Sequence, residues 1–221
     1  MLRQEDLGID NLKIYQDDEL YCFTSDAILL SRFAKVKKGD LVADFCSGSG
    51  IVGLHLYALN KDKNLSVTLF EMQKEMFDMS VKSIQLNNLQ GVFTAVNSKI
   101  QDLGSEYNEK FSLIVCNPPY AKAQSGLNAQ NPQIALCKSE IALTLEDLIK
   151  GISRCLKFSG RTCIVHRADR LAEVFGTMLK YNLEPKRLQV VCAKDKAPYL
   201  VLIEAVKGGK SGLSVLPFIE N

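Results

Sequence analysis

Two segments of the chain carry residues whose types and spacing could bind a ligand and act on it. The first is Gly48-Ser49-Gly50-Ile51-Val52-Gly53, which fits the pattern G-x-G-x-x-G directly after an apolar run. Glycines there let the backbone approach a ligand closely, and the free N–H groups of the following helix face it. Glu71 lies 18 residues beyond Gly53, at the end of the next apolar run, where a carboxylate can bind both hydroxyls of a ribose. These residues predict a ligand that contains a nucleoside.

Asp44 distinguishes between two ligands, NAD and S-adenosyl-L-methionine, that both fit such a loop. It lies four residues before Gly48, where its charge would face the central part of the ligand. A dinucleotide places an anionic pyrophosphate in this loop, and a nearby carboxylate would repel it. S-adenosyl-L-methionine has an ammonium and a sulfonium group there instead, and both are cationic. Asp44 therefore favours the methyl donor; its alternative role is that of a simple helix or turn cap.

The second segment is Asn117-Pro118-Pro119-Tyr120, which follows the apolar run 111–116. An exocyclic amine or amide nitrogen is a poor nucleophile because its lone pair is delocalised. Two acceptors, the Asn117 side-chain oxygen and the Pro118 carbonyl, would bind its N–H groups and favour the pyramidal geometry that can attack. Tyr120 offers a flat face for stacking, worth about 1–3 kcal/mol for a base. Beside the glycine loop, this segment predicts methyl transfer to a planar amine by positioning and electrostatics.

Alternating strands and helices must position these two segments. We expect strands at 41–45, 67–70, 92–96, 111–116, 162–165, 188–192 and 199–206, and helices at 27–33, 51–59, 74–88, 145–156 and 168–179. Helices between successive strands imply parallel pairing with helices on both faces of the sheet. The last two strands are joined by a short loop and should form an antiparallel hairpin. The expected fold is α/β and Rossmann-like, with seven mostly parallel strands and an antiparallel C-terminal hairpin.

Composition points to one globular domain, 1–221, because 47% of the 221 residues are hydrophobic and 24% are charged. No apolar run approaches the roughly 18 residues of a membrane span, and the first residues lack the apolar core of a signal peptide. The seven cysteines form no C-x-x-C pair, so we expect buried reduced thiols, no metal site and a cytoplasmic protein.

Segments 1–33 and 121–143 fall outside the strand–helix alternation, and the second is expected to be a lid or substrate loop.

Charge is unevenly distributed along the chain. Residues 1–156 hold 16 basic and 19 acidic side chains, whereas residues 157–221 hold 11 basic and 6 acidic ones. The excess suggests a basic face built from the last third, and ordinary solvated lysines explain it equally well.

The chain resembles the class I S-adenosyl-L-methionine-dependent methyltransferases that modify planar nitrogens. The run Asp44-Phe45-Cys46-Ser47-Gly48-Ser49-Gly50 is similar to their D-x-G-x-G-x-G, with Cys46 in place of the first glycine. Within this group the chain is most similar to the tRNA1(Val) adenine-37 N6-methyltransferase family, over residues 5–218. The further matching runs are Phe23-Thr24-Ser25-Asp26-Ala27-Ile28-Leu29-Leu30, Ser139-Glu140-Ile141, Leu156-Lys157-Phe158-Ser159-Gly160-Arg161, Val165-His166-Arg167-Ala168-Asp169-Arg170-Leu171 and Lys207-Gly208-Gly209-Lys210.

The resemblance implies roles for the matching positions. The donor-site positions are Thr24, Asp26, Asp44, Cys46, Ser47, Gly48, Gly50, Glu71, Met72, Ile100 and Asn117. Among them, Thr24 and Asp26 of segment 1–33 would close over the donor, and Glu71 would hold its ribose. The catalytic positions are Asn117, Pro118 and Tyr120. The positions expected near RNA phosphates are Lys138, His166, Arg167 and Arg170, for which ordinary surface charges at a helix start are the alternative.

Three positions depart from the family pattern. Lys99 stands where the family usually has an aspartate near the donor adenine, and Asp102 could replace it only if the loop shifts its register. Lys138-Ser139 stands where the family usually has Arg-His, which bears on RNA contacts. Cys46 must adopt a backbone φ that an L-residue can take.

The resemblance implies N6-methylation of an adenine in RNA, with tRNA as the expected substrate. Guanine-N2 methylation of ribosomal RNA and N-methylation of a protein glutamine use the same tetrapeptide and remain alternatives. A DNA adenine methyltransferase is disfavoured because 221 residues leave little room for a sequence-reading domain. A donor- or RNA-binding module without catalysis is the alternative from another class, and Asn117 and Tyr120 argue against it.

Overall fold

Short apolar runs form a central parallel sheet in a computed structural model that describes residues 2–18, 20, 25–119 and 143–221. Its parallel strands are β3 (Leu41–Phe45), β4 (Ser66–Glu71), β5 (Phe93–Asn97), β6 (Phe111–Cys116) and β7 (Leu156–Arg167), in the spatial order β7-β6-β3-β4-β5. All six residues of β6 are buried. The predicted α/β architecture with a mostly parallel sheet is confirmed.

Four further strands extend the sheet beyond β7 within the described residues, and of these β9 is antiparallel to its neighbours. Strand β9 (Pro198–Lys207) lies between β7 and β8 (Leu183–Cys192) and is antiparallel to both. Two strands of two residues each, β10 (Ser214–Val215) and β11 (Ile219–Glu220), pair with the outer edge of β8. Over the described residues the sheet therefore has nine strands rather than the expected seven. Strands as short as these two carry no periodicity that a sequence could reveal.

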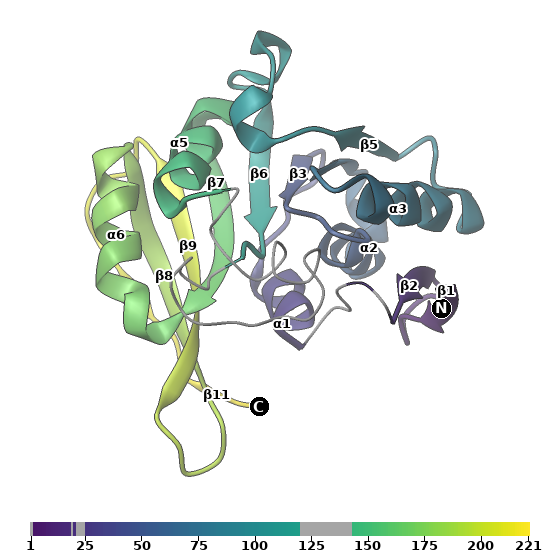
Figure 1. Cartoon of the computed structure of the whole chain (residues 1–221). Coiled ribbons are helices and arrows are strands. Elements are labelled where there is room, and N and C mark those ends of the chain that lie inside the picture. Colours follow the sequence, from purple (N-terminus) through teal and green to yellow (C-terminus); the bar gives the residue numbers. More distant parts are fainter. Residues whose placement is uncertain (1, 19, 21–24, 120–142) are drawn as a thin grey trace.

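Helices cover both faces of this sheet (Figure 1). One hydrophobic core includes residues of α1 (Ser25–Phe33), α2 (Ile51–Ala58) and α3 (Lys74–Leu86), and the other includes residues of α5 (Leu145–Cys155) and α6 (Leu171–Lys180). Neighbouring strand residues such as Val42 and Ala43 belong to different cores because side chains alternate across a strand. Short 3-10 turns occur at Lys61–Lys63, Ile100–Asp102, Ser105–Tyr107 and Ala168–Arg170.

A separate N-terminal hairpin was not expected from the sequence. It pairs β1 (Leu2–Asp6) with β2 (Lys13–Asp17) and packs on α3. The Tyr15 N–H donates to Ser83 Oγ at 3.0 Å, and the Asn87 amide exchanges two hydrogen bonds with the backbone of Lys13. Strand β1 escaped prediction because four of its five residues are polar or charged.

Three predicted site residues, Thr24, Tyr120 and Lys138, lie outside the described residues, as does nearly all of segment 121–143. Within the described ranges, no helix is long and apolar enough to cross a membrane.

Candidate active site

A cavity of about 860 Å³ lies at the carboxyl ends of β3, β4, β5 and β6. Open parallel sheets bind ligands at this edge because the loops that follow neighbouring strands converge there. Both predicted segments reach the cavity, although they are far apart in the sequence. The predicted site residues that line it are Cys46, Ser47, Gly48, Glu71, Met72, Ile100 and Asn117.

The glycine loop is shaped by backbone conformation and by close packing. Gly50, directly before α2, has φ +92°, and a Cβ there would lie 2.9 Å from Leu69 Cδ1. A Cβ on Gly53 would lie 2.7 Å from Leu69 Cδ2. Position 50 thus favours glycine through its left-handed φ as well as its close contact, whereas a side chain at position 53 would have to displace the Leu69 methyl group between α2 and β4. Cys46 also has a left-handed backbone, with φ +58°, which an L-residue can adopt at a modest cost in free energy.

Asp44 is completely buried beneath this loop and does not line the cavity itself. Its Oδ2 accepts a hydrogen bond from the Gly53 N–H at 2.9 Å, whereas its Oδ1 has no hydrogen-bond partner among the described residues. Burial, and to a smaller extent the nearby Glu71 carboxylate, raises the pKa of Asp44 to about 8. Ser47 Oγ is likewise buried and without a hydrogen-bond partner in the described chain. Unsatisfied buried oxygens are costly, so a cationic or donor group placed here would gain from both of them.

Glu71 is held more completely than Asp44. Its Oε2 accepts from the Gly48 N–H and its Oε1 from the Gln73 N–H, each at 2.8 Å. Burial raises the pKa of Glu71, and these backbone N–H groups act in the opposite direction. The carboxyl group is thereby fixed in the cavity wall at the end of β4.

The segment after β5 places Lys99 and Gln101 in the cavity wall. Asp102 ends the 3-10 turn Ile100–Asp102, is exposed and does not line the cavity. The register shift that would bring Asp102 to the position of the family aspartate is therefore not observed.

Asn117 and Pro118 follow β6 directly, with Asn117 half-buried in the cavity wall and Pro118 buried. A second hollow, of about 170 Å³, adjoins the cavity through Pro119 and Leu143. Pro118 and His166 lie in the wall of this hollow.

The candidate RNA contacts differ from expectation. His166 is 1% exposed, and burial, followed by the charge of Arg170, lowers its pKa to about 4. Arg170 is also buried and forms two hydrogen bonds, of 2.9 and 2.7 Å, to Glu173. Both side chains are therefore buried, rather than presented at the surface of the described chain as the sequence-based prediction assumed. Arg167 is exposed and paired with Asp169.

Asp26 and Gln16 are two further residues whose location bears on the predictions from the sequence. Asp26 lies half-buried in the first turn of α1 and is not part of the cavity wall. Gln16, which the sequence did not suggest, is buried in β2, and its Nε2 donates to Ser49 Oγ of the glycine loop at 3.0 Å. In the sequence, Gln16 is a polar residue between Tyr15 and Asp17, in a strand that we did not predict, so nothing marked it as a contact of the glycine loop. Among the described residues, no cluster of three or more His, Cys, Asp or Glu side chains could hold a metal ion.

A sequence model of the methyltransferase small domain family matches residues 23–180 of the chain. A tRNA1(Val) (adenine(37)-N6)-methyltransferase of Shewanella sp. (strain W3-18-1) is 28% identical over 162 residues, which cover 69% of this chain and 64% of the relative. A release factor glutamine methyltransferase of Clostridium botulinum is 26% identical over 181 residues, covering 78% of this chain and 62% of the relative. The chain thus spans less than two thirds of the length of both relatives.

Solved structures share the fold. A crystal structure of a predicted O-methyltransferase from Agrobacterium tumefaciens superposes with a TM-score of 0.69 at 19% identity, covering 88% of this chain and 86% of that protein.

Proposed function

We propose, from the premise that this chain belongs to the methyltransferase small domain family and is an S-adenosyl-L-methionine-dependent methyltransferase, that it methylates the exocyclic amine of an adenine in RNA, with tRNA as its substrate. The observation that carries the proposal is the meeting of the glycine loop and Asn117 in one cavity. A donor site and a clasp for a planar amine are then adjacent, as methyl transfer requires.

The residues of the glycine loop fit the donor. S-adenosyl-L-methionine supplies, when bound, an electrophilic methyl group on a cationic sulfonium. Ser47 Oγ lines the cavity and would receive the charged methionine end, and Asp44, buried beneath the loop, would stabilise its charge; Ser47 Oγ and Asp44 Oδ1 both lack hydrogen-bond partners in the described chain. Glu71 would bind the ribose from the end of β4, where two backbone N–H groups already orient its carboxyl group. Lys99 and Gln101 would lie nearest the adenine, in place of the aspartate that the family usually has.

The target amine would be held at the end of β6. The Asn117 side-chain oxygen and the Pro118 carbonyl would accept its two N–H groups, and Tyr120 would stack on the base. The hydrogen bonds would orient the nitrogen lone pair toward the donor, so that positioning rather than a strong base provides the acceleration. His166 beneath Pro118 is neutral at physiological pH because burial lowers its pKa to about 4.

Relatives support RNA over protein as the substrate, because tRNA1(Val) (adenine(37)-N6)-methyltransferases of several Shewanella species and of Bacteroides thetaiotaomicron are similar to this chain at 24–28% identity. One relative of nearly the same similarity is a release factor glutamine methyltransferase. A glutamine side chain presents the same planar N–H₂ group to Asn117, so it is the second candidate substrate.

The test is methyl transfer from labelled donor to tRNA taken from cells that lack this protein, with nucleosides identified by mass spectrometry. We expect N6-methyladenosine, and we expect Asn117→Ala to lower the transfer rate on the order of a hundredfold while donor binding persists. Asn108→Ala, an exposed asparagine near the opposite end of β6, is the matched control and should transfer at the normal rate. Transfer to a release factor but not to tRNA would contradict the proposal.

A further inference from the structure

The hairpin between β8 and β9 projects from the end of the sheet at which the cavity lies. The last pair between β7 and β9 is Arg167 with Leu200, and β8 and β9 continue beyond it to the pair Cys192 with Pro198. Figure 1 shows this hairpin reaching past the ends of β6 and β7. It therefore projects beyond the ends of the strands whose following loops line the cavity.

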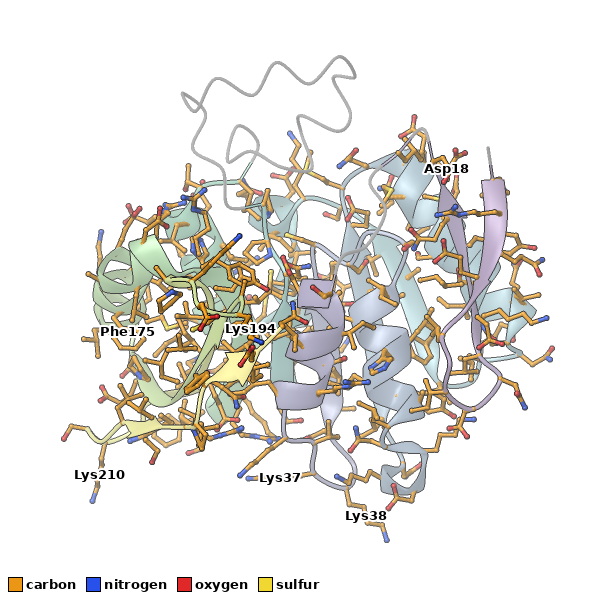
Figure 2. All side chains as sticks on the ribbon, turned by 90° about the horizontal axis from the view of Figure 1, so that it is seen from below. Asp18, Lys37, Lys38, Phe175, Lys194 and Lys210 are labelled. Carbon is orange, nitrogen blue, oxygen red and sulfur yellow. The ribbon has the colours of Figure 1, made fainter. Side chains whose placement is uncertain are left out.

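The tip of this hairpin is basic and exposed. Lys194, Asp195 and Lys196 are all exposed, and neither lysine forms an ion pair within the described part of the chain. The turn is closed by a hydrogen bond of 3.0 Å from the Lys196 N–H to the Ala193 carbonyl, with Asp195 at φ +55°. Figure 2, which views the molecule from below, shows Lys194 beside the C-terminal strand.

The C-terminal residues brace the hairpin against the rest of the molecule. Strand β11 pairs with Val191 and Cys192, and the Asn221 N–H donates to the Cys192 carbonyl at 2.9 Å. The Asn221 side-chain Nδ2 lies 2.8 Å from Tyr199 Oη and 3.1 Å from Ser25 Oγ. Because Ser25 is the first residue of α1, these bonds fix the hairpin relative to that helix. A braced hairpin loses little conformational entropy when it binds a partner.

Exposed aromatic side chains occur on the base of the hairpin and on the C-terminal segment that braces it. Tyr199, at the base of the hairpin, is 40% exposed, and Phe218, directly before β11, is 67% exposed. Exposed rings beside ammonium groups are what single-stranded nucleic acids bind, since bases stack on the rings and phosphates pair with the charges. By contrast, His166 and Arg170, which the sequence suggested as phosphate contacts, are buried.

We propose that the hairpin tip with its braced aromatic residues, namely Lys194, Lys196, Tyr199 and Phe218, is a docking surface for the unpaired nucleotides of the RNA substrate. The two ammonium groups bind backbone phosphates, and the rings bind bases that flank the target. This inference rests on the proposed function, because it takes the substrate to be RNA. It assigns to the hairpin a role in RNA affinity and none in donor binding.

The experiment measures binding of a fluorescently labelled, unmodified tRNA transcript over a range of salt concentrations. The variant is Lys194→Gln/Lys196→Gln. The matched control is Lys37→Gln/Lys38→Gln, which removes the same charge from exposed lysines just before β3, at the opposite edge of the sheet (Figure 2). Loss of two phosphate contacts should lower the slope of log affinity against log salt by about 1 to 2 and weaken binding on the order of tenfold at about 0.1 M salt. The control should retain the wild-type slope.

A further variant tests the rings. Tyr199→Phe keeps the aromatic face and loses only the hydrogen bond to Asn221, whereas Tyr199→Ala removes the face. We expect Tyr199→Ala to weaken tRNA binding several-fold more than Tyr199→Phe, with donor affinity by calorimetry unchanged in both. Equal slopes for the hairpin and control variants, while the wild type methylates tRNA, would overturn this inference and leave the proposed function standing. Methyl transfer to a release factor with no tRNA binding would overturn both.

Discussion

Two buried carboxyl groups lie under the same loop and are satisfied to different degrees. Both oxygens of Glu71 accept backbone hydrogen bonds, whereas Asp44 has one bonded oxygen and one without a hydrogen-bond partner among the described residues. Since desolvation penalises the charged form, the pKa of Asp44 rises to about 8. Asp44 is therefore the residue whose ionisation depends most on a cation in the site.

This imbalance predicts a pH-dependent donor affinity. Without a ligand, the protonated form of Asp44 is favoured in the folded state, so its contribution to the free energy of unfolding is lost as the pH rises from about 4 toward 8. A bound ammonium group favours the ionised carboxylate. Affinity for S-adenosylhomocysteine, which keeps that ammonium group, should thus increase with pH over the same range, and binding should release a proton from Asp44.

Calorimetry in buffers of different ionisation enthalpy measures both the affinity and the proton release. Asp44→Asn should weaken binding roughly tenfold to a hundredfold, as expected for loss of a hydrogen bond to a charged group, and should remove the released proton. Glu71→Gln is the comparison variant. Because two backbone N–H groups fix the Glu71 carboxyl group, this substitution should change S-adenosylhomocysteine affinity with less change in proton release. Identical proton release by the wild type and Asp44→Asn would contradict this account.

Sequence reasoning found the site residues that terminate strands. Asp44, Glu71 and Asn117 lie at or next to the ends of β3, β4 and β6, and residues at the carboxyl ends of parallel strands converge without any knowledge of side-chain packing. His166 was placed on the substrate side but not recognised as buried, because its exposure depends on β9 and on the turn that follows it. Gln16 was missed because its strand was missed.

At the scale of elements, a strand is predicted accurately where its apolar pattern is clear and inaccurately where that pattern is missing. Strands β3 and β6 begin and end at the predicted residues, because each is a short, mostly apolar run with one polar residue, Asp44 or Ser112. Strand β7 begins six residues before the prediction, since Lys157, Phe158 and Ser159 are exposed and carry no apolar pattern. The hairpin of β1 and β2 packs on α3 through the buried Ile14 and through side chain–backbone hydrogen bonds, and no hydrophobic periodicity reveals the latter.

The N-terminal hairpin is coupled to the donor loop through one buried hydrogen bond, and this predicts an effect at a distance. Gln16→Ala removes the donor to Ser49 Oγ and leaves a buried hydroxyl without that partner, at a cost of about 1–3 kcal/mol. We expect donor affinity to fall several-fold. The control Gln4→Ala removes an exposed hydrogen bond to Tyr15 Oη on the same hairpin and should leave donor affinity unchanged. Equal losses in the two variants would show that hairpin stability, not the Gln16–Ser49 contact, sets the affinity.

In the whole molecule, a buried ion pair lies at the edge of the sheet opposite the cavity. Asp40, directly before β3, accepts hydrogen bonds from Arg161 Nη2 at 2.6 Å, from Ser112 Oγ at 2.7 Å and from the Lys37 N–H at 2.7 Å. Arg161 also donates to the Lys35 carbonyl. Burial alone would raise the pKa of Asp40, but these bonds together hold that pKa below its usual value of 3.8. The cluster joins β3, β6 and β7 at their amino-terminal ends, so it stabilises the sheet without touching the cavity.

The ion pair and the cavity lie at opposite ends of the strands. A variant of the ion pair should therefore lose stability and keep the donor site. Arg161→Met leaves Asp40 buried without its cation and should lower the free energy of unfolding by roughly 3 to 5 kcal/mol at neutral pH. Because the folded pKa of Asp40 is lowered, the difference from wild type should shrink as the pH falls through that value, below 3.8. Asp40→Asn/Arg161→Met should recover part of the loss, since no charge is left unpaired. Urea unfolding at several pH values measures these differences, and calorimetry of the folded variant should show wild-type donor affinity. A weakened donor affinity in folded Arg161→Met would mean that the two edges of the sheet are mechanically coupled, contrary to this prediction.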